Sequence, residues 1–265
     1  MSSEKYVMAV EELAYAMGVL GGVDTAIGFL LAILGERPRL ETEGRLLAAS
    51  HALIARDYLD FDVETGEKWL DEGLKNAVMA MMRNDYSLRC SRIANGRELN
   101  KNLYVWGDGL IAHTLHREVV SQLELMADWE TARMHCRTFF PFPSEQETET
   151  VILATFPADL IDQIRMTAFE RSVDEIAAEL MRYEISQETA KQFAADIRQQ
   201  DYRGSVMKIE MSQDQPISNH GFLILAAGER YWLMDIKPSY APQIKLYAGN
   251  EATFHQLFSS LISIS

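Results

Sequence analysis

Residues 221–236 of the chain read GFLILAAGERYWLMDI, and this stretch decides the fold. Two apolar runs, Gly221–Ala227 and Arg230–Ile236, flank a short turn that contains Gly228 and Glu229. Apolar runs of this length around a glycine turn predict a β-hairpin. Strands joined by so short a turn must be antiparallel, so we expect an antiparallel sheet around this hairpin.

An earlier segment has the same pattern. Residues 103–140 align with residues 224–261 at a constant spacing of 121, which places the Gly-Asp and Gly-Glu turns in register. A second match joins residues 75–86, KNAVMAMMRNDY, to residues 191–202, KQFAADIRQQDY, at a spacing of 116. We predict that the chain is a divergent internal duplication. Coincidence between two amphipathic segments is the alternative explanation.

Helix signals precede the strands of the second copy. Ser172 and Glu175 form a capping box, and Ser186 caps a second helix whose apolar residues recur at i, i+3, i+4 and i+7. The period then changes to two, and we expect Lys208 and Glu210 to face solvent while the apolar residues between and beside them face the core. A strand near 244–247 and a helix over 251–262 complete the copy.

The first copy repeats this order. The predicted elements are strands at 86–93, 102–106, 110–116 and 119–125, a helix over 128–139, and earlier helices over 10–20, 27–34 and 46–58. The sequence therefore predicts an α+β fold of two pseudo-repeated halves, each of helices plus an antiparallel β-sheet. We place the halves at 1–143 and 144–265, because neither period continues through the Pro141–Ser144 stretch and the acidic run to Glu149.

Composition restricts the function. A net charge of −14 and a pI near 4.9 would repel a polyanion, so nucleic acid is an unlikely partner and a protein partner is favoured. The N-terminal residues lack the apolar core of a secretory signal, and no apolar run is long enough to cross a membrane. We therefore expect a cytoplasmic protein in which Cys90 and Cys136 are buried thiols.

No catalytic motif stands out, and we predict a non-enzymatic protein with no cofactor and no metal. His113 and His116 form an HxxH, but on a strand these two residues point to opposite faces, so His113 is predicted to lie in the core. The acidic residues of 60–64 are predicted to form a solvated edge, and Gly18 and Gly21-Gly22 a helix stop.

Basic residues gather at one place in this acidic chain. We predict that they form a partner-binding surface, with a plain solvated face as the alternative. These residues are Arg83, Arg89, Arg92, Arg97 and Lys101.

Two pseudo-symmetric halves of helices and antiparallel strands, with Gly228-Glu229-Arg230-Tyr231 opening the late hairpin strand, resemble the ESX (type VII) secretion-associated chaperones. That family has a Gly-Arg-Tyr-like segment at this place, although Glu229 is inserted here. The resemblance implies a cytosolic protein-binding protein, a chaperone or adaptor for a helical secretion substrate.

Two other classes stay open at this point. A tandem winged-helix DNA-binding regulator also combines helices with short wings, and Ala48–Asp62 has its helix-then-strand pattern. The net charge and the absence of a basic recognition helix oppose it. An enzyme of unknown class is the other alternative, because scattered catalytic groups leave no motif.

Overall fold

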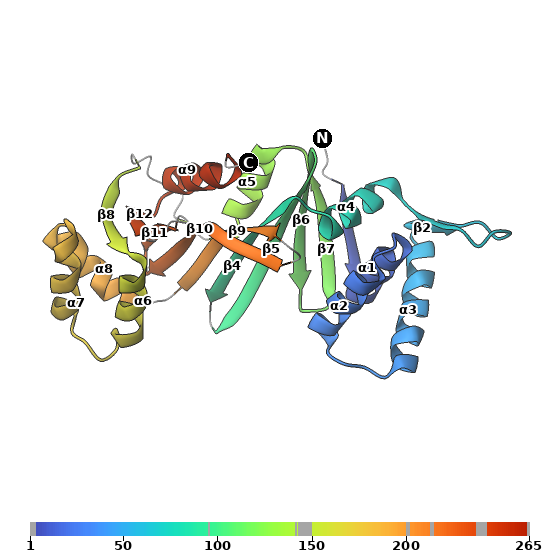
Figure 1. The fold of residues 1–265 in the computed structure, drawn as a ribbon, viewed down its shortest axis with the longest axis horizontal. Helices are drawn as coiled ribbons and strands as arrows, with labels where there is room; N and C mark the ends of the chain where they lie inside the picture. The colour runs from blue at the N-terminus through green and yellow to red at the C-terminus, as the bar shows by residue number, and fades with distance from the viewer. Residues whose placement is uncertain are drawn as a thin grey trace. The chain divides into compact units, whose positions relative to one another are not determined.

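The chain forms two compact units, each built from helices and antiparallel strands, as Figure 1 shows. The first unit comprises Met1–Ser87 and Lys101–Ala132, and the second comprises Leu88–Asn100 and Arg133–Ser265. The computed structural model describes residues 4–94, 96–140, 142, 150–199, 202–212, 215–236 and 243–263. The predicted α+β class is confirmed.

The first unit begins with a strand and three helices. Its elements are β1 (Lys5–Ala9), α1 (Val10–Val19), α2 (Val23–Leu34), α3 (Arg39–Ile54), β2 (Leu59–Phe61), β3 (Lys68–Leu70), α4 (Glu72–Met82), β6 (Gly109–His116) and β7 (Val120–Met126). Three further elements have residues in both units: β4 (Tyr86–Ala94), β5 (Arg97–Trp106) and α5 (Trp129–Arg137).

The second unit also begins with a strand followed by helices, without a counterpart of the β2–β3 pair among its described residues. Its elements are β8 (Ile152–Pro157), α6 (Ala158–Thr167), α7 (Val173–Leu180), the short 3-10 helix η1 (Met181–Tyr183), α8 (Gln187–Gln199), β9 (Tyr202–Ser212), β10 (Gln215–Ala227), β11 (Arg230–Ile236), β12 (Gln243–Ala248) and α9 (Glu251–Ile262).

Ten strands of the described residues form one sheet, and β2 and β3 form a separate pair. The sheet order is β1-β7-β6-β5-β4-β9-β10-β11-β12-β8. The pattern β1-β7-β6-β5-β4 therefore matches β8-β12-β11-β10-β9, strand for strand. This agreement is what a duplication would produce, although common descent of the two copies stays a prediction.

The two matched hairpins have the same turn. Gly107 and Gly228 have φ values of 54° and 58°, a left-handed conformation that glycine adopts without steric cost. The spacing changes beyond them, because Asp128 and Asn250 cap α5 and α9 and lie 122 residues apart. One alignment spacing of 121 therefore holds for the hairpins but not for the helices that follow.

Several local predictions are confirmed. Ser172 Oγ accepts from the Glu175 amide at 3.2 Å while the Glu175 carboxylate accepts from the Ser172 amide at 2.7 Å, which is the predicted capping box. Ser186 likewise caps α8 through the Thr189 amide. The boundary at 143/144 falls outside the described residues and stays a prediction.

Strands β1, β3 and β8 and helix α6 were not predicted. Strand β1 pairs with β7, and β8 pairs with β12, so each depends on a partner about a hundred residues away in sequence. Such short segments carry little periodicity of their own. Helix α6, which follows β8 directly, was missed with it, and α3 begins earlier than predicted.

The prediction that Lys208 faces solvent was wrong. Its side chain is buried, with 4% of its surface exposed, and it pairs with Glu210 at 3.0 Å. Strand β9 lies between β4 and β10 in the sheet, and Val206, on the same strand face as Lys208, is fully buried. Burial along this part of β9 alternates with the phase opposite to the predicted one, because Met207 and Ile209 are only half-buried.

Each unit has its own apolar core. In the first unit, α1 and α4 pack against the strands through Leu13, Leu74 and Leu123, all fully buried. In the second, Phe156 and Phe193 lie in the core formed by α6, α7, α8 and the strands. Helix α1 is held in place by the core of the first unit, and α2 and α3 both pack against α1.

Candidate functional site

Helix α2 is apolar on nearly all of its surface, yet it is barely buried. Its sequence is VDTAIGFLLAIL, and Ala26 is its one buried residue within this fully described helix. A helix that is hydrophobic all round is normally enclosed by protein or lipid. The exposure of α2 therefore marks a surface that lacks a covering element among the described residues.

One stripe of α2 carries most of the exposed apolar surface. Val23, Ile27 and Leu31 stand at i, i+4 and i+8, so they share one helix face. Their exposed fractions are 55%, 59% and 50%. Single exposed apolar residues need no explanation, but an aligned stripe on one helix indicates a binding surface.

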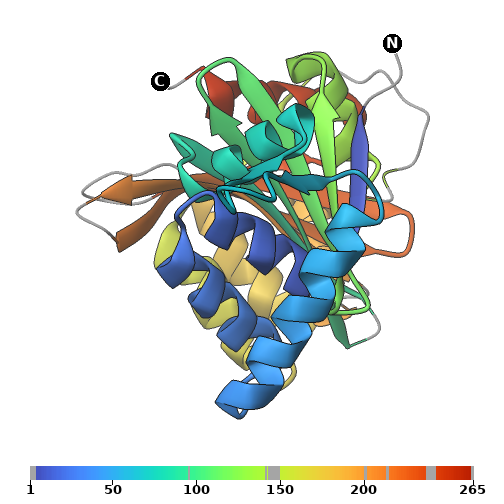
Figure 2. The same cartoon turned by 90° about the vertical axis from the view of Figure 1, so that its right-hand side faces the viewer.

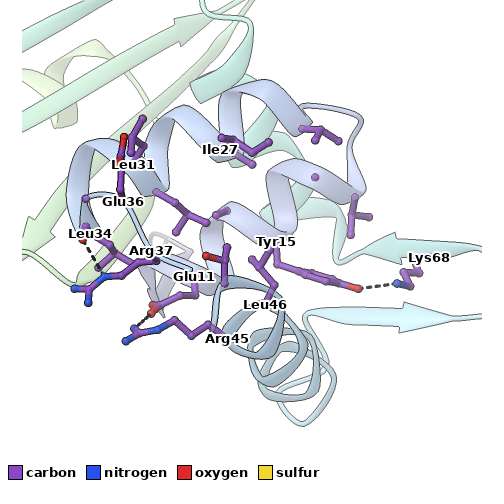
Figure 3. Close-up of a pocket in the computed structure, with 18 residues that line it drawn as sticks. Glu11, Tyr15, Ile27, Leu31, Leu34, Glu36, Arg37, Arg45, Leu46 and Lys68 are labelled. Atoms are coloured by element: carbon purple, nitrogen blue, oxygen red, sulfur yellow. Dashed lines mark hydrogen bonds and ion pairs between the residues drawn. The ribbon is translucent and has the colours of Figure 1, made fainter. Parts of the chain in front are cut away.

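The stripe lines a groove. Both α2 and α3 pack against α1, and these three helices are the blue ones in Figure 2. The lining residues drawn in Figure 3 come mainly from these helices, with α1 as the floor and the other two as the walls. The cavity volume is about 730 Å³. The lining residues are Glu11, Ala14, Tyr15, Gly18, Val19, Val23, Ala26, Ile27, Leu30, Leu31, Leu34, Gly35, Glu36, Arg37, Thr42, Arg45, Leu46 and Lys68.

The floor of the groove is open because of a glycine. A Cβ added at Gly18 would meet no atom within 4 Å, so the space above this residue is empty of protein atoms. Gly35, which ends α2, has a φ of 69° and turns the chain toward α3. The groove thus depends on the missing side chain at Gly18 and on the turn at Gly35, where α2 ends.

Charged side chains surround the apolar lining. Arg45 pairs with Glu11 at 2.8 Å and with Glu41 at 3.0 Å, and the hydrogen bond to Glu11 raises the pKa of Arg45. Lys68 donates to the Tyr15 hydroxyl at 2.6 Å and lies 5.3 Å from the centre of that ring. The rim is therefore polar while the interior is apolar, as in binding sites generally.

Arg37 completes the rim at the loop that joins α2 to α3. Its Nε donates to the backbone oxygen of Leu34 at 3.2 Å, as Figure 3 shows. The other rim residues in this figure are Glu36, beside Arg37, and Lys68, at the opposite end of the view.

The predicted basic residues do not share one face. Arg83 follows α4, and Arg89 is exposed on β4, where it contacts Asn100 at 3.4 Å and Glu98 at 3.7 Å. Arg97 is exposed at the start of β5. Strand alternation places Arg89 and Arg97 on opposite faces of this hairpin, because Asn100 contacts Arg89 and has the opposite parity to Arg97.

Two of the basic residues are partly or fully enclosed. Arg92 donates to the Phe139 backbone oxygen at 2.8 Å and lies 5.0 Å from the centre of the Phe139 ring, so it supports the end of α5. Lys101 is 9% exposed. A partner-binding role for the five residues stays a prediction, and Arg83, Arg89 and Arg97 are its exposed members.

The HxxH lies on strand β6, as predicted. His113 is buried, 3.2 Å from the Ser121 hydroxyl, and His116 is exposed. Burial, with a smaller contribution from the charge of His116, lowers the pKa of His113 to about 4. Within the described residues, no group of three His, Cys, Asp or Glu side chains could hold a metal ion.

The acidic stretch after α3 forms a turn. The carboxylate of Asp62 accepts from the amides of Glu64 and Thr65 at 2.7 and 2.8 Å, which lowers the pKa of Asp62. These bonds close the connection between β2 and β3. The carboxylate of Asp62 therefore has a structural role in this turn.

Sequence reasoning missed the groove. It predicted a helix over 27–34 but assigned no role to the apolar character of that helix. The signal was present, because the run from Val23 to Leu34 has only Asp24 and Thr25 as polar residues. No helix in the described part of the chain has the length and apolarity to span a bilayer.

The sequence matches no protein-family model, and no curated protein matches it. The structure is similar to that of the Mycobacterium tuberculosis type VII secretion system chaperone EspG5, solved in complex with a PE25-PPE41 dimer. The TM-score is 0.68 at 9% sequence identity, over 98% of this chain and 96% of that chain. The predicted resemblance to the ESX chaperones is thus confirmed at the level of the fold.

Proposed function

We propose that the protein is a non-enzymatic, chaperone-like binding protein that holds an α-helix of a protein partner in the α1–α3 groove. The observation that carries this proposal is the stripe of Val23, Ile27 and Leu31, which is about half exposed on an otherwise apolar helix. Helix α2 is about 18 Å long, enough to contact roughly three turns of a bound helix.

The fold supports the proposal. Its structural neighbour is a chaperone solved with a protein dimer, and the groove here has the apolar interior and polar rim that suit a protein segment. A cytosolic setting and a secretion substrate as the partner belong to the same proposal. Exposed Arg89 is proposed as a second contact for that partner, whereas Arg97 lies on the other face of the hairpin and cannot share this contact.

Nucleic-acid binding has less support. The chain carries a net charge of −14, and a tandem winged-helix protein would need a basic helix for the major groove. The helices around the groove instead present aliphatic side chains. An enzyme would need convergent titratable groups in a cavity, whereas the interior of this groove is lined by Ala, Val, Ile and Leu.

A designed peptide tests the proposal. The probe is a labelled amphipathic peptide of about 18 residues, with leucines at i, i+3, i+4 and i+7 and Ala, Gln and neutral polar residues elsewhere. Fluorescence anisotropy should show saturable binding to the wild-type protein. Binding should be lost in Gly18→Leu, because the new side chain enters the groove floor.

Gly28→Leu is the matched control. A Cβ at Gly28 also meets no atom within 4 Å, and Gly28 does not line the groove. Both variants add one leucine at a helix position with open space around its Cβ. If both variants bind the peptide as the wild type does, the groove is not the binding site and the proposal fails.

A further inference from the structure

Two of the three cations that line the groove lack a carboxylate neighbour among the described residues. Three cations and two carboxylates line it, and Arg45 is neutralised by Glu11 and Glu41. Arg37 and Lys68 differ, because no carboxylate among the described residues lies within ion-pair distance of either. Both donate hydrogen bonds to neutral oxygens, Arg37 to the Leu34 backbone and Lys68 to the Tyr15 hydroxyl.

Among the described residues, Arg37 and Lys68 share the lack of a nearby carboxylate with exposed cations such as Arg97 and Arg117, even though the chain has a net charge of −14. Acidic residues outnumber basic ones by 39 to 25, so an exposed cation has many possible partners. The cations Arg39, Arg45, Lys75 and Arg165 all have a carboxylate within 4 Å. Arg37 and Lys68 are therefore available for a carboxylate from outside.

The positions of these two cations fit a bound helix. Arg37 lies at the loop after α2, and Lys68 lies beside Tyr15 at the other end of the view in Figure 3. A helix laid along the apolar stripe would therefore have one cation toward each of its ends. Its polar flanks would then approach a cation at each end of the groove.

We propose that the groove selects amphipathic helices that carry acidic residues beside their apolar stripe, through Arg37 and Lys68. This inference rests on the proposed function and names the partner class for the same site. Exposed charge pairs contribute modestly to affinity, so the charges decide the preference between partners while the apolar stripe supplies most of the affinity. A basic helix would meet the same apolar surface but would place like charges against Arg37 and Lys68.

Two peptides with the same leucine stripe test this inference, one with Glu and one with Lys at the flanking positions. For the wild-type protein at low salt, we expect the dissociation constant of the Glu peptide to be roughly tenfold lower. Arg37→Glu/Lys68→Glu should reverse this order. The control is Arg39→Glu/Lys75→Glu, which changes the net charge equally at exposed positions outside the groove and should keep the wild-type order.

Different results would contradict the charge inference and the proposed function. Equal affinity for both peptides, with both lost in Gly18→Leu, would overturn the charge inference and leave the proposed function standing. Absence of binding by either peptide would overturn both. A wild-type dimer that Gly18→Leu converts to monomer in light scattering would show that a second copy of the chain occupies the groove, which also contradicts the inference.

Discussion

The carboxylate of Asp196 on α8 accepts two hydrogen bonds from the guanidinium of Arg230 on β11, at 2.8 and 2.7 Å. It also accepts from the indole N–H of Trp232 at 2.9 Å. Asp196 is fully buried, whereas the Arg230 side chain is 53% exposed. The pair therefore joins a helix to a strand through a charge that cannot reach water.

The difference in exposure between Asp196 and Arg230 predicts which substitution lowers the free energy of unfolding more. Arg230→Met leaves a buried carboxylate without its cation and should lower the free energy of unfolding by about 3 kcal/mol or more. Asp196→Asn removes the buried charge, keeps an acceptor for Trp232, and should cost less. Urea denaturation of both variants gives the comparison, and an equal or smaller loss in Arg230→Met would contradict this account.

His113 predicts a pH dependence of stability. The unfolded chain takes up a proton near the ordinary pKa of 6.5, whereas the folded protein does so only near 4. Stability should therefore fall as the pH drops from about 6.5 to 4, by up to about 3 kcal/mol, and this contribution should change no further below that range.

His113→Gln is the variant for comparison, because glutamine carries no proton in this range. The difference in unfolding free energy between the two proteins should shrink or change sign as the pH falls through the same window. His116→Gln is the control, since His116 is exposed. Parallel pH curves for the wild type and His113→Gln would be evidence against a buried neutral His113.

The thiols of Cys90 and Cys136 should be protected from reagents. Their sulfur atoms lie 3.4 Å apart, and both residues are completely buried. We expect an aromatic disulfide reagent to label neither thiol rapidly in the native protein and both in guanidinium, at a native rate that follows unfolding. Rapid labelling of the native protein would show that one of the thiols is accessible.

The groove stripe should contribute to binding and little to stability. Ile27→Gln/Leu31→Gln should change the free energy of unfolding by no more than about 0.5 kcal/mol per site, because both side chains are already half exposed. Peptide binding should be lost. Leu13→Ala, at a fully buried position of α1, should by contrast cost about 2 to 5 kcal/mol. A large loss of stability in the glutamine variant would show that the stripe belongs to the core.

Much of the local structure could be predicted. The hairpin turns at Gly107 and Gly228 and the capping box of Ser172 depend on residues within a few positions of one another, where steric and hydrogen-bonding rules suffice. Strands β1 and β8 could not be predicted, because their pairing partners lie far away in sequence.

The candidate site likewise has some features that the sequence shows and others that only the structure shows. The apolar run of α2 and the cluster of basic residues around β4 and β5 can both be recognised from the sequence. Only the structure shows that Arg92 lies against Phe139, because this contact depends on a neighbouring element. Only the structure shows that Arg89 and Arg97 lie on opposite faces of the hairpin, because strand pairing decides where each side chain points.

By itself, the sequence determined the α+β class, the hairpins, the helix caps and the acidic character of the chain, all of which follow from composition and short-range order. The tertiary structure decided which apolar surfaces are covered. Val23, Ile27 and Leu31 are as apolar as any core residue, and they stay exposed because α2 and α3 both pack on α1 and leave a groove between them. Hydrophobic burial is not directional, so a pattern of apolar residues specifies that a surface will be covered without specifying by what.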